Sequence, residues 1–219
     1  MSRPLALTSC LLLAGAVFAA PVPKGQKSGP AFLDLSAHTN HNLKDDFNSG
    51  RYPGNNLASL PAGKQTFAEV KFHIGKGLMQ LGSTSYKGKP EKIEGIKVGR
   101  TLARLHFLHA TCFRAPDDTV IAKYVIHYTD KTKSEVEVVY GKDVVDWWDY
   151  SGQKAPTQGK AAWEGENEPA KGFDAKIKLY LTSWKNPHPA KKVVSLDFVA
   201  TAAETGAAPF CVAITADDK

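Results

Sequence analysis

Short runs in which apolar and polar residues alternate are the feature that most restricts the fold of this chain. A period of two residues is that of a β-strand with one buried face, whereas an amphipathic helix repeats every 3.6 residues. Gly, Pro, Asn and Asp, the residues of turns, separate the runs. The pattern predicts these inward positions: Val70, Phe72 and Ile74; Ala122, Tyr124, Ile126 and Tyr128; Val136 and Val138; Ile177, Leu179 and Leu181; Val194, Leu196 and Phe198.

Two further segments complete the predicted strand set. Leu102–Ala110 is apolar throughout, as expected of a central strand, and Phe210–Thr215 predicts a short last strand. No segment of the mature chain predicts a long helix, although Val144–Trp148 could form a helical turn. Eight or more strands predict an all-β antiparallel sandwich of two sheets. The domain is too long for a seven-stranded immunoglobulin arrangement, which favours a jelly roll.

The N-terminus has the pattern of a secretory signal. Arg3 precedes an uncharged run from Leu5 to Ala20 that is too short to span a bilayer. Val17 and Ala19 predict cleavage after Ala19. We therefore expect a signal peptide (1–19), a flexible leader (20–30), a single sandwich domain (31–216) and a tail (217–219). The mature protein would be exported to the periplasm, cell surface or exterior, without a membrane span.

Charge and cysteine content restrict the partners and the redox chemistry. The chain has 28 Lys and Arg against 22 Asp and Glu, a formal charge of +6, and these residues are interspersed. Nucleic-acid binding needs clustered basic residues, so no nucleic-acid partner is expected. In an exported chain Cys112 and Cys211 could form a disulfide, or both could be small buried apolar residues.

Motifs of common enzymes are absent from the sequence. It has no Gly-x-Ser-x-Gly elbow, no His-Glu-x-x-His pair and no phosphate-binding Gly-x-x-x-x-Gly-Lys loop. Glu164, Glu166 and Glu168 lie beside Trp163 and could supply paired carboxylates, but a solvated acidic loop is the simpler interpretation. We expect a protein without catalytic activity.

A loop from His38 to Gly63 is rich in Asn and Asp. His38 and His41 with Asp45 and Asp46 could hold a transition metal, but the oxygen-rich composition better suits a structural calcium ion. No other cofactor is expected. The later pair His106 and His109 would point to opposite faces of a strand and is expected to be structural.

Tryptophans carry the strongest ligand-binding signal. Trp147, Trp148, Tyr150 and Trp163 fall close together, and one of the two adjacent tryptophans is expected in the core. A flat ring beside Asp and Asn suits a sugar, which has an apolar C–H face and polar edges, although the same rings could fill a core. The predicted ligand-binding residues are Trp148, Trp163, Asn167, Trp184 and Asn186.

The order of several short motifs resembles one family. The motifs are Phe32–Leu35 with Asn40, Leu60–Phe67, Val70–Ile74, Phe107–Ala110, Tyr124–Tyr128 with Asp130, Gly141–Trp148, Trp163-x-Gly165-x-Asn167, Leu179–Leu181, Trp184-x-Asn186-Pro187-x-Pro189, Ser195-x-Asp197-Phe198 and Ala213–Thr215. They resemble the galactose-binding-like β-sandwich modules of secreted bacterial proteins, which are often attached to glycoside hydrolases. The chain departs from that pattern at Lys71, where proline is expected, and at Lys131, where glycine is expected.

The resemblance implies a jelly roll that binds polysaccharide or another glycan without catalysis. We therefore expect a secreted, non-catalytic carbohydrate-binding module. A structural or protein-interaction domain of the cell envelope and a glycan hydrolase are the alternatives, and fold analogy does not decide among them.

Overall fold

The structure is a computed structural model that describes residues 30–47 and 51–218. The predicted signal peptide and nearly all of the leader lie outside the described residues. The elements are β1 (Ala31–Phe32), β2 (His41–Asn42), β3 (Gly63–Phe67), β4 (Val70–Ile74), β5 (Gly77–Gln80), β6 (Lys92–Arg100), β7 (Arg104–Cys112), β8 (Val120–Tyr128), β9 (Lys133–Val139), β10 (Trp148–Tyr150), β11 (Lys160–Gly165), α1 (Glu168–Gly172), β12 (Ala175–Lys185), β13 (Val193–Ala200), the 3₁₀ turn η2 (Ala203–Thr205) and β14 (Ala208–Asp217).

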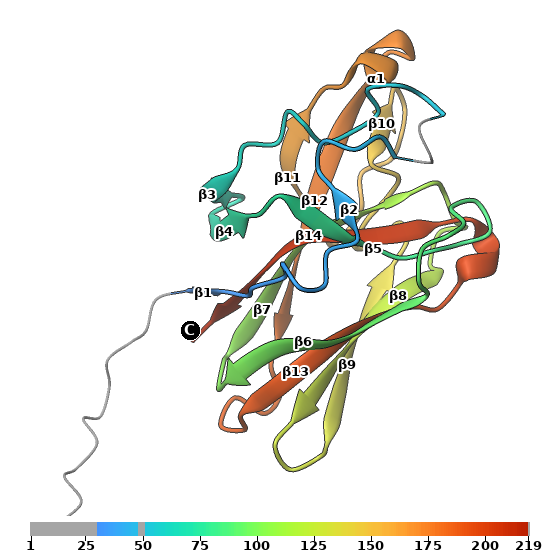
Figure 1. The fold of residues 1–219 in the computed structure, drawn as a ribbon. Coiled ribbons are helices and arrows are strands. Elements are labelled where there is room, and N and C mark those ends of the chain that lie inside the picture. The colour runs from blue at the N-terminus through green and yellow to red at the C-terminus, as the bar shows by residue number, and fades with distance from the viewer. Residues whose placement is uncertain (1–29, 48–50, 219) are drawn as a thin grey trace, which may run out of the picture.

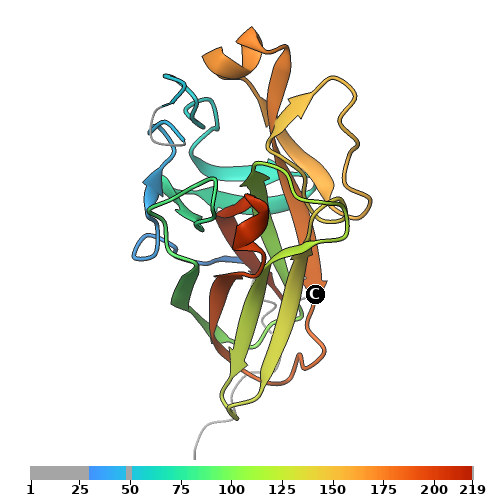
Figure 2. The same cartoon turned by 90° about the vertical axis from the view of Figure 1, so that its right-hand side faces the viewer.

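These strands form an antiparallel β-sandwich. The larger sheet has the order β10-β12-β7-β14-β5-β2, with β1 paired to β14 and β11 paired to β12, and the smaller sheet has the order β6-β13-β8-β9. The strands β3 and β4 form a separate hairpin. Figure 1 shows β10, β11 and α1 at one end of the molecule, and Figure 2 shows the β8–β9 hairpin tip at the other end. The predicted all-β sandwich is confirmed, in an arrangement consistent with a jelly roll.

Three stacked rings join the two sheets. Tyr124 on β8 stacks on Phe107 of β7, with ring centroids 4.0 Å apart, and on Phe198 of β13, at 4.7 Å. All three side chains are buried. Since β7 belongs to the larger sheet and β8 and β13 to the smaller one, this stack lies between the two layers.

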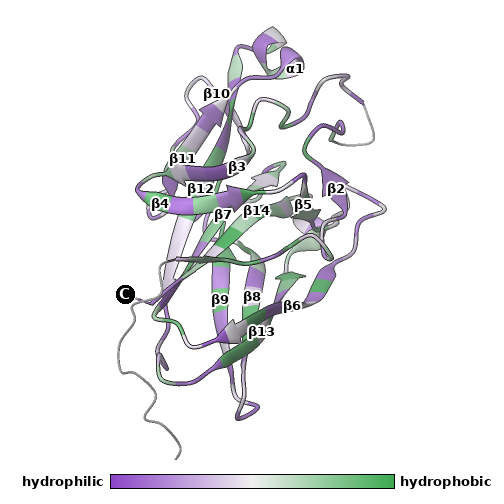
Figure 3. Cartoon of the chain, turned by 60° about the vertical axis from the view of Figure 1, so that its left-hand side comes forward, coloured by the Kyte–Doolittle hydropathy of each residue, from purple (hydrophilic) through white to green (hydrophobic). Residues whose placement is uncertain are grey.

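The two-residue alternation predicts most of the buried faces correctly. On β8 the inward residues from Ala122 to Tyr128 are at most 3% exposed. Figure 3 shows the corresponding bands of apolar and polar colour along β8 and β9. The apolar run Leu102–Ala110 corresponds to β7, which pairs with β12 on one side and β14 on the other, as expected of a central strand.

One predicted inward position is wrong. Val194 on β13 is 44% exposed, while Val193, Leu196 and Phe198 are buried. The ladders of β13 with both β6 and β8 shift register between Val193 and Ser195. A bulge adds a residue at that point and reverses the faces of the residues before it, so alternation alone assigns Val194 to the wrong side.

Helical structure is confined to short elements in the described ranges. Val144–Trp148 is irregular and leads into β10, while the helix α1 forms further along the chain. Among residues 30–47 and 51–218, no helix has the length and apolar character needed to cross a bilayer.

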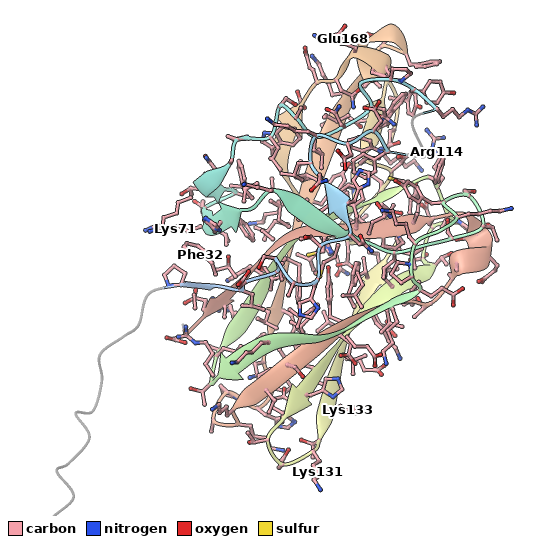
Figure 4. All side chains as sticks on the ribbon, viewed as in Figure 1. Phe32, Lys71, Arg114, Lys131, Lys133 and Glu168 are labelled. Atoms are coloured by element: carbon pink, nitrogen blue, oxygen red, sulfur yellow. The ribbon has the colours of Figure 1, made fainter. Side chains whose placement is uncertain are left out.

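The two departures from the family pattern fall at the edges of the fold (Figure 4). Lys131 lies in the β8–β9 turn with φ of 68°, a left-handed conformation that favours glycine. Lys71 is exposed on β4, and its carbonyl oxygen accepts a hydrogen bond from Thr215 Oγ1 at 2.8 Å. Neither lysine lies near the α1 end of the sandwich.

Candidate functional site

A small hollow opens at the α1 end of the sandwich. Its volume is about 100 Å³. The residues that line it come from the two loops that the sequence marks by their Asn, Asp and Trp content, together with the end of β7. They are Phe47, Tyr52, Asn55, Cys112, Phe113, Asp146, Trp147, Trp148 and Tyr150.

Backbone hydrogen bonds hold the Trp147–Trp148 segment between two strands. Trp147 N–H donates to Thr111 O at the end of β7, at 2.9 Å, and its carbonyl accepts from Lys178 N–H of β12, at 2.8 Å. The Trp147 ring packs inward against Phe47, with centroids 4.6 Å apart. Both tryptophans belong to the buried core, with Trp147 3% and Trp148 7% exposed, rather than one of the pair as expected, and both line the hollow.

Aromatic rings surround Trp148 and form the rim of the hollow, which we call the aromatic rim: Tyr52, Trp148, Tyr150 and Phe173. The Trp148 centroid lies 6.1 Å from that of Tyr52, 5.8 Å from Tyr150 and 5.6 Å from Phe173. Phe173 is 54% exposed, the most exposed large apolar side chain among the described residues. The rim thus presents apolar ring surface to solvent, while Trp148 itself is 7% exposed.

A single amide oxygen orients both Trp148 and the helix beside it. Asn55 Oδ1 accepts hydrogen bonds from Trp148 Nε1 at 3.0 Å and from Asn167 Nδ2 at 3.1 Å. Asn167 Oδ1 in turn accepts from Ala170 N–H, which caps the N-terminus of α1. Phe173 is the C-cap residue of this one-turn helix, so the cap at Asn167 helps to place the Phe173 ring over Trp148.

Asp146 supplies the carboxylate of the hollow. It accepts a hydrogen bond from Trp148 N–H at 3.3 Å. Burial raises the pKa of the Asp146 carboxyl to about 6, against the opposing effects of hydrogen bonding to the backbone and of the positive charge of Arg114. The site can therefore hold a hydrogen-bond acceptor whose charge changes near neutral pH.

A strained residue precedes the nearest arginine. Phe113 has φ of 64°, a left-handed conformation that is unusual for a bulky side chain and costs about 1–2 kcal/mol. The next residue, Arg114, is exposed, and its Cζ lies 5.5 Å from the centroid of the Tyr150 ring. The local backbone thus brings a guanidinium to the aromatic rim.

The five predicted ligand residues lie in three places. Trp148 and Asn167 meet at the hollow through Asn55. Trp163 lies on β11, across β12 from Trp148, and its ring covers Gly165, where an added Cβ would clash with it. Ser59 also borders Gly165, and its hydroxyl donates to Glu166 O at 2.9 Å.

Trp184 and Asn186 lie at the opposite end of β12. Trp184 pairs with Leu105 and is partly buried against the core. Asn186 is buried, donates to Leu102 O at 2.9 Å and accepts from the Tyr128 hydroxyl at 2.7 Å. Its amide therefore ties the β6–β7 connection, β8 and the end of β12 together.

Sequence reasoning does not single out Tyr52, Phe173 or Arg114. Tyr52 falls within the predicted loop 38–63, and Phe173 follows the cluster of Trp147, Trp148, Tyr150 and Trp163, but neither segment indicates that the two rings contact each other. Tyr150 belongs to the aromatic cluster visible in the sequence. Grouping aromatic residues from both loops would have found the rim, whereas Arg114 carries no local signal.

The predicted metal and disulfide residues have other partners. Asp46 Oδ1 accepts from Gly54 N–H at 2.9 Å, and Asp45 Oδ2 accepts from Asn42 Nδ2 at 2.7 Å, so these acids stabilise their own loop. In the described ranges no three His, Cys, Asp or Glu side chains gather as a metal site. Cys112 and Cys211 are buried free thiols.

Those two cysteines lie on neighbouring strands but out of register. Cys112 on β7 is opposite Ala208, while Cys211 on β14 is opposite His109. Three residues along a strand span about 10 Å, beyond the roughly 7 Å that a disulfide bridges between Cα atoms. A bridge would require the backbone of β7 or β14 to move.

Two clusters bear on the hydrolase alternative. The acids beside Trp163 pair with lysines: Glu164 lies 3.4 Å from Lys178, and Glu166 contacts Lys171 and Lys176. Elsewhere, Ser183 Oγ lies 2.7 Å from His106 Nδ1. The other ring nitrogen of His106 is 3.9 Å from the carboxylate of Asp217, longer than a hydrogen bond.

No protein-family model matches the chain, and no curated protein matches its sequence at a significant level. The arguments on function therefore rest on the residues of the hollow and its rim.

Proposed function

We propose that this protein is an exported, non-catalytic carbohydrate-binding module that holds a sugar at the aromatic rim. The observation that supports this is the contiguous set of rings, Tyr52, Trp148, Tyr150 and Phe173, of which the first three line the hollow together with Asp146. A pyranose has an apolar C–H face that suits an aromatic ring and hydroxyl groups that suit a carboxylate. We also infer that the sandwich is a jelly roll of the galactose-binding-like class.

Each group has a separate role in this proposal. Phe173 and Tyr52 supply ring surface, since Phe173 is exposed and Tyr52 is partly so. Asp146 accepts hydrogen bonds from sugar hydroxyls. Asn55 orients Trp148, because its amide oxygen already accepts two hydrogen bonds.

The dimensions of the hollow suggest what part of a glycan it takes. A volume of about 100 Å³ admits one edge or one end of a single sugar ring rather than several linked rings. By analogy with bases stacked on aromatic side chains, each ring should contribute about 1–3 kcal/mol. Affinity for one site should therefore be modest, and a terminal or protruding sugar unit is the expected contact.

Binding to a panel of soluble and insoluble polysaccharides tests the proposal. In the protein with the substitution Phe173→Ala, affinity should fall by about tenfold or more, which corresponds to at least about 1.4 kcal/mol. Thermal stability should change little, because Phe173 is mostly exposed. Val194→Ala is the matched control, since Val194 is the other exposed large apolar residue in the described ranges and lies on the smaller sheet.

The tryptophans away from the hollow provide a second comparison. Trp163→Ala and Trp184→Ala should leave affinity unchanged in the fraction of protein that remains folded. If no glycan is retained, or if Phe173→Ala binds as the wild type does while one of these two variants loses binding, the assignment of the hollow is refuted.

A further inference from the structure

Two arginines flank the aromatic rim, each over a tyrosine. Arg51 Cζ lies 5.4 Å from the centroid of Tyr52, and Arg114 Cζ lies 5.5 Å from that of Tyr150. Both arginine side chains are exposed. Because Tyr52 and Tyr150 both contact Trp148, the two guanidinium groups lie over rings of the same aromatic rim.

These guanidinium groups are not neutralised by ion pairs within the described part of the chain. Neither makes one there, whereas the neighbouring lysines do: Lys178 lies 2.6 Å from Asp149, and Lys171 lies 3.3 Å from Glu166. Arg100, at the end of β6, pairs with Asp218 at 2.7 Å. Positive charge at the rim is therefore available to a ligand.

Resting on the carbohydrate-binding function proposed above, we propose that the ligand is an acidic saccharide whose carboxylate is bound by Arg51 and Arg114. Guanidinium groups suit this task because their planar fork pairs with a carboxylate through two parallel hydrogen bonds. They are also weakly hydrated and stack on aromatic rings, so they can lie on Tyr52 and Tyr150 and still present N–H groups.

The Asp146 carboxylate does not exclude an acidic ligand. It lies in the wall of the hollow and accepts a hydrogen bond from Trp148 N–H, whereas the arginines are at the exposed rim. Burial also raises its pKa to about 6, so the negative charge that a ligand meets falls as the pH drops through that value. A sugar can thus direct its carboxylate to the rim and its hydroxyl groups to Asp146.

The experiment compares two forms of one polymer. Polygalacturonate with free carboxylates and the same polymer after full methyl esterification differ in charge and not in backbone. Binding of both should be measured for the wild type, for Arg51→Gln, for Arg114→Gln and for Arg114→Lys. Lys133→Gln is the control, since it removes the same charge from an exposed residue at the far hairpin end (Figure 4).

We expect the wild type to bind the free acid at least about tenfold more tightly than the ester, as for loss of a hydrogen bond to a charged group. Each Arg→Gln variant should lose that preference, Arg114→Lys should recover part of it, and Lys133→Gln should keep it. Melting curves would show that these exposed substitutions leave the fold intact.

Two results would overturn the inference in different ways. Equal binding of acid and ester, with Phe173→Ala still weakening both, removes the acidic ligand and leaves the carbohydrate-binding proposal standing. An equal loss of binding in Lys133→Gln and the arginine variants would mean that overall charge, not the rim, attracts the polymer. Failure of every glycan to bind refutes both proposals.

Discussion

Acidification should destabilise this protein through one buried imidazole. His109 on β7 is 1% exposed, with Nδ1 3.2 Å from the Tyr124 hydroxyl and Nε2 2.7 Å from Thr182 Oγ1. Burial lowers the pKa of His109 from 6.5 to about 3. Between these values the unfolded chain binds a proton that the folded chain does not, so stability is present at neutral pH and is lost as pH falls.

The size of the effect follows from that interval. At 1.36 kcal/mol per pKa unit, lowering the pH from 7 to 4 should remove about 3 kcal/mol of unfolding free energy through His109. Total stabilities of small domains are about 5–15 kcal/mol, so this is a large fraction. The substitution His109→Gln should cost stability at pH 7 but should make the further loss at pH 4 smaller by about 3 kcal/mol.

Urea unfolding curves at pH 7 and pH 4 measure this difference. His73→Gln is the control, because it removes an exposed imidazole on β4 rather than a buried one. Other groups titrate identically in the wild type and the variant, so the comparison isolates His109. Parallel pH profiles for the wild type and His109→Gln would refute the reasoning.

Three further predictions concern an acid, a glycine and the two cysteines. Burial raises the pKa of Asp146 from 3.8 to about 6, so its effect is opposite in sign to that of His109: the unfolding free energy falls as the pH rises through 6. Asp146→Asn removes that loss. The unfolding free energy of this variant relative to the wild type should therefore be about 3 kcal/mol higher at pH 7 than at pH 4, measured by the same unfolding curves. Gly165→Ala should lower stability by about 1–3 kcal/mol because the added Cβ meets the Trp163 ring, and an unchanged melting temperature would contradict this. Cys112 and Cys211 should both react with an alkylating reagent in denaturant without reductant, and mass spectrometry showing an unlabelled, oxidised pair would contradict the free thiols.

Local sequence determines the strands and much of the core. A period of two is a property of the extended backbone itself, so β8 and β12 can be located from their own residues. Each run has an apolar face that is stabilised only when it is buried, so two sheets must pack against each other. This makes the sandwich predictable. The pattern fails at Val194, where a bulge in β13 changes the face without any signature in the alternation.

The hollow depends on contacts between distant segments. Tyr52 and Trp148 are far apart in sequence, and Asn55 Oδ1 meets Trp148 and Asn167 across separations of 93 and 112 residues. Aromatic and amide side chains have the same local preferences whether they bind a ligand or fill a core. The sequence therefore determined which residue types were available. The tertiary structure decided that Asn186 holds strands together and that Tyr52, Trp148 and Phe173 share one surface, because only the packed sheets bring those loops to the same end.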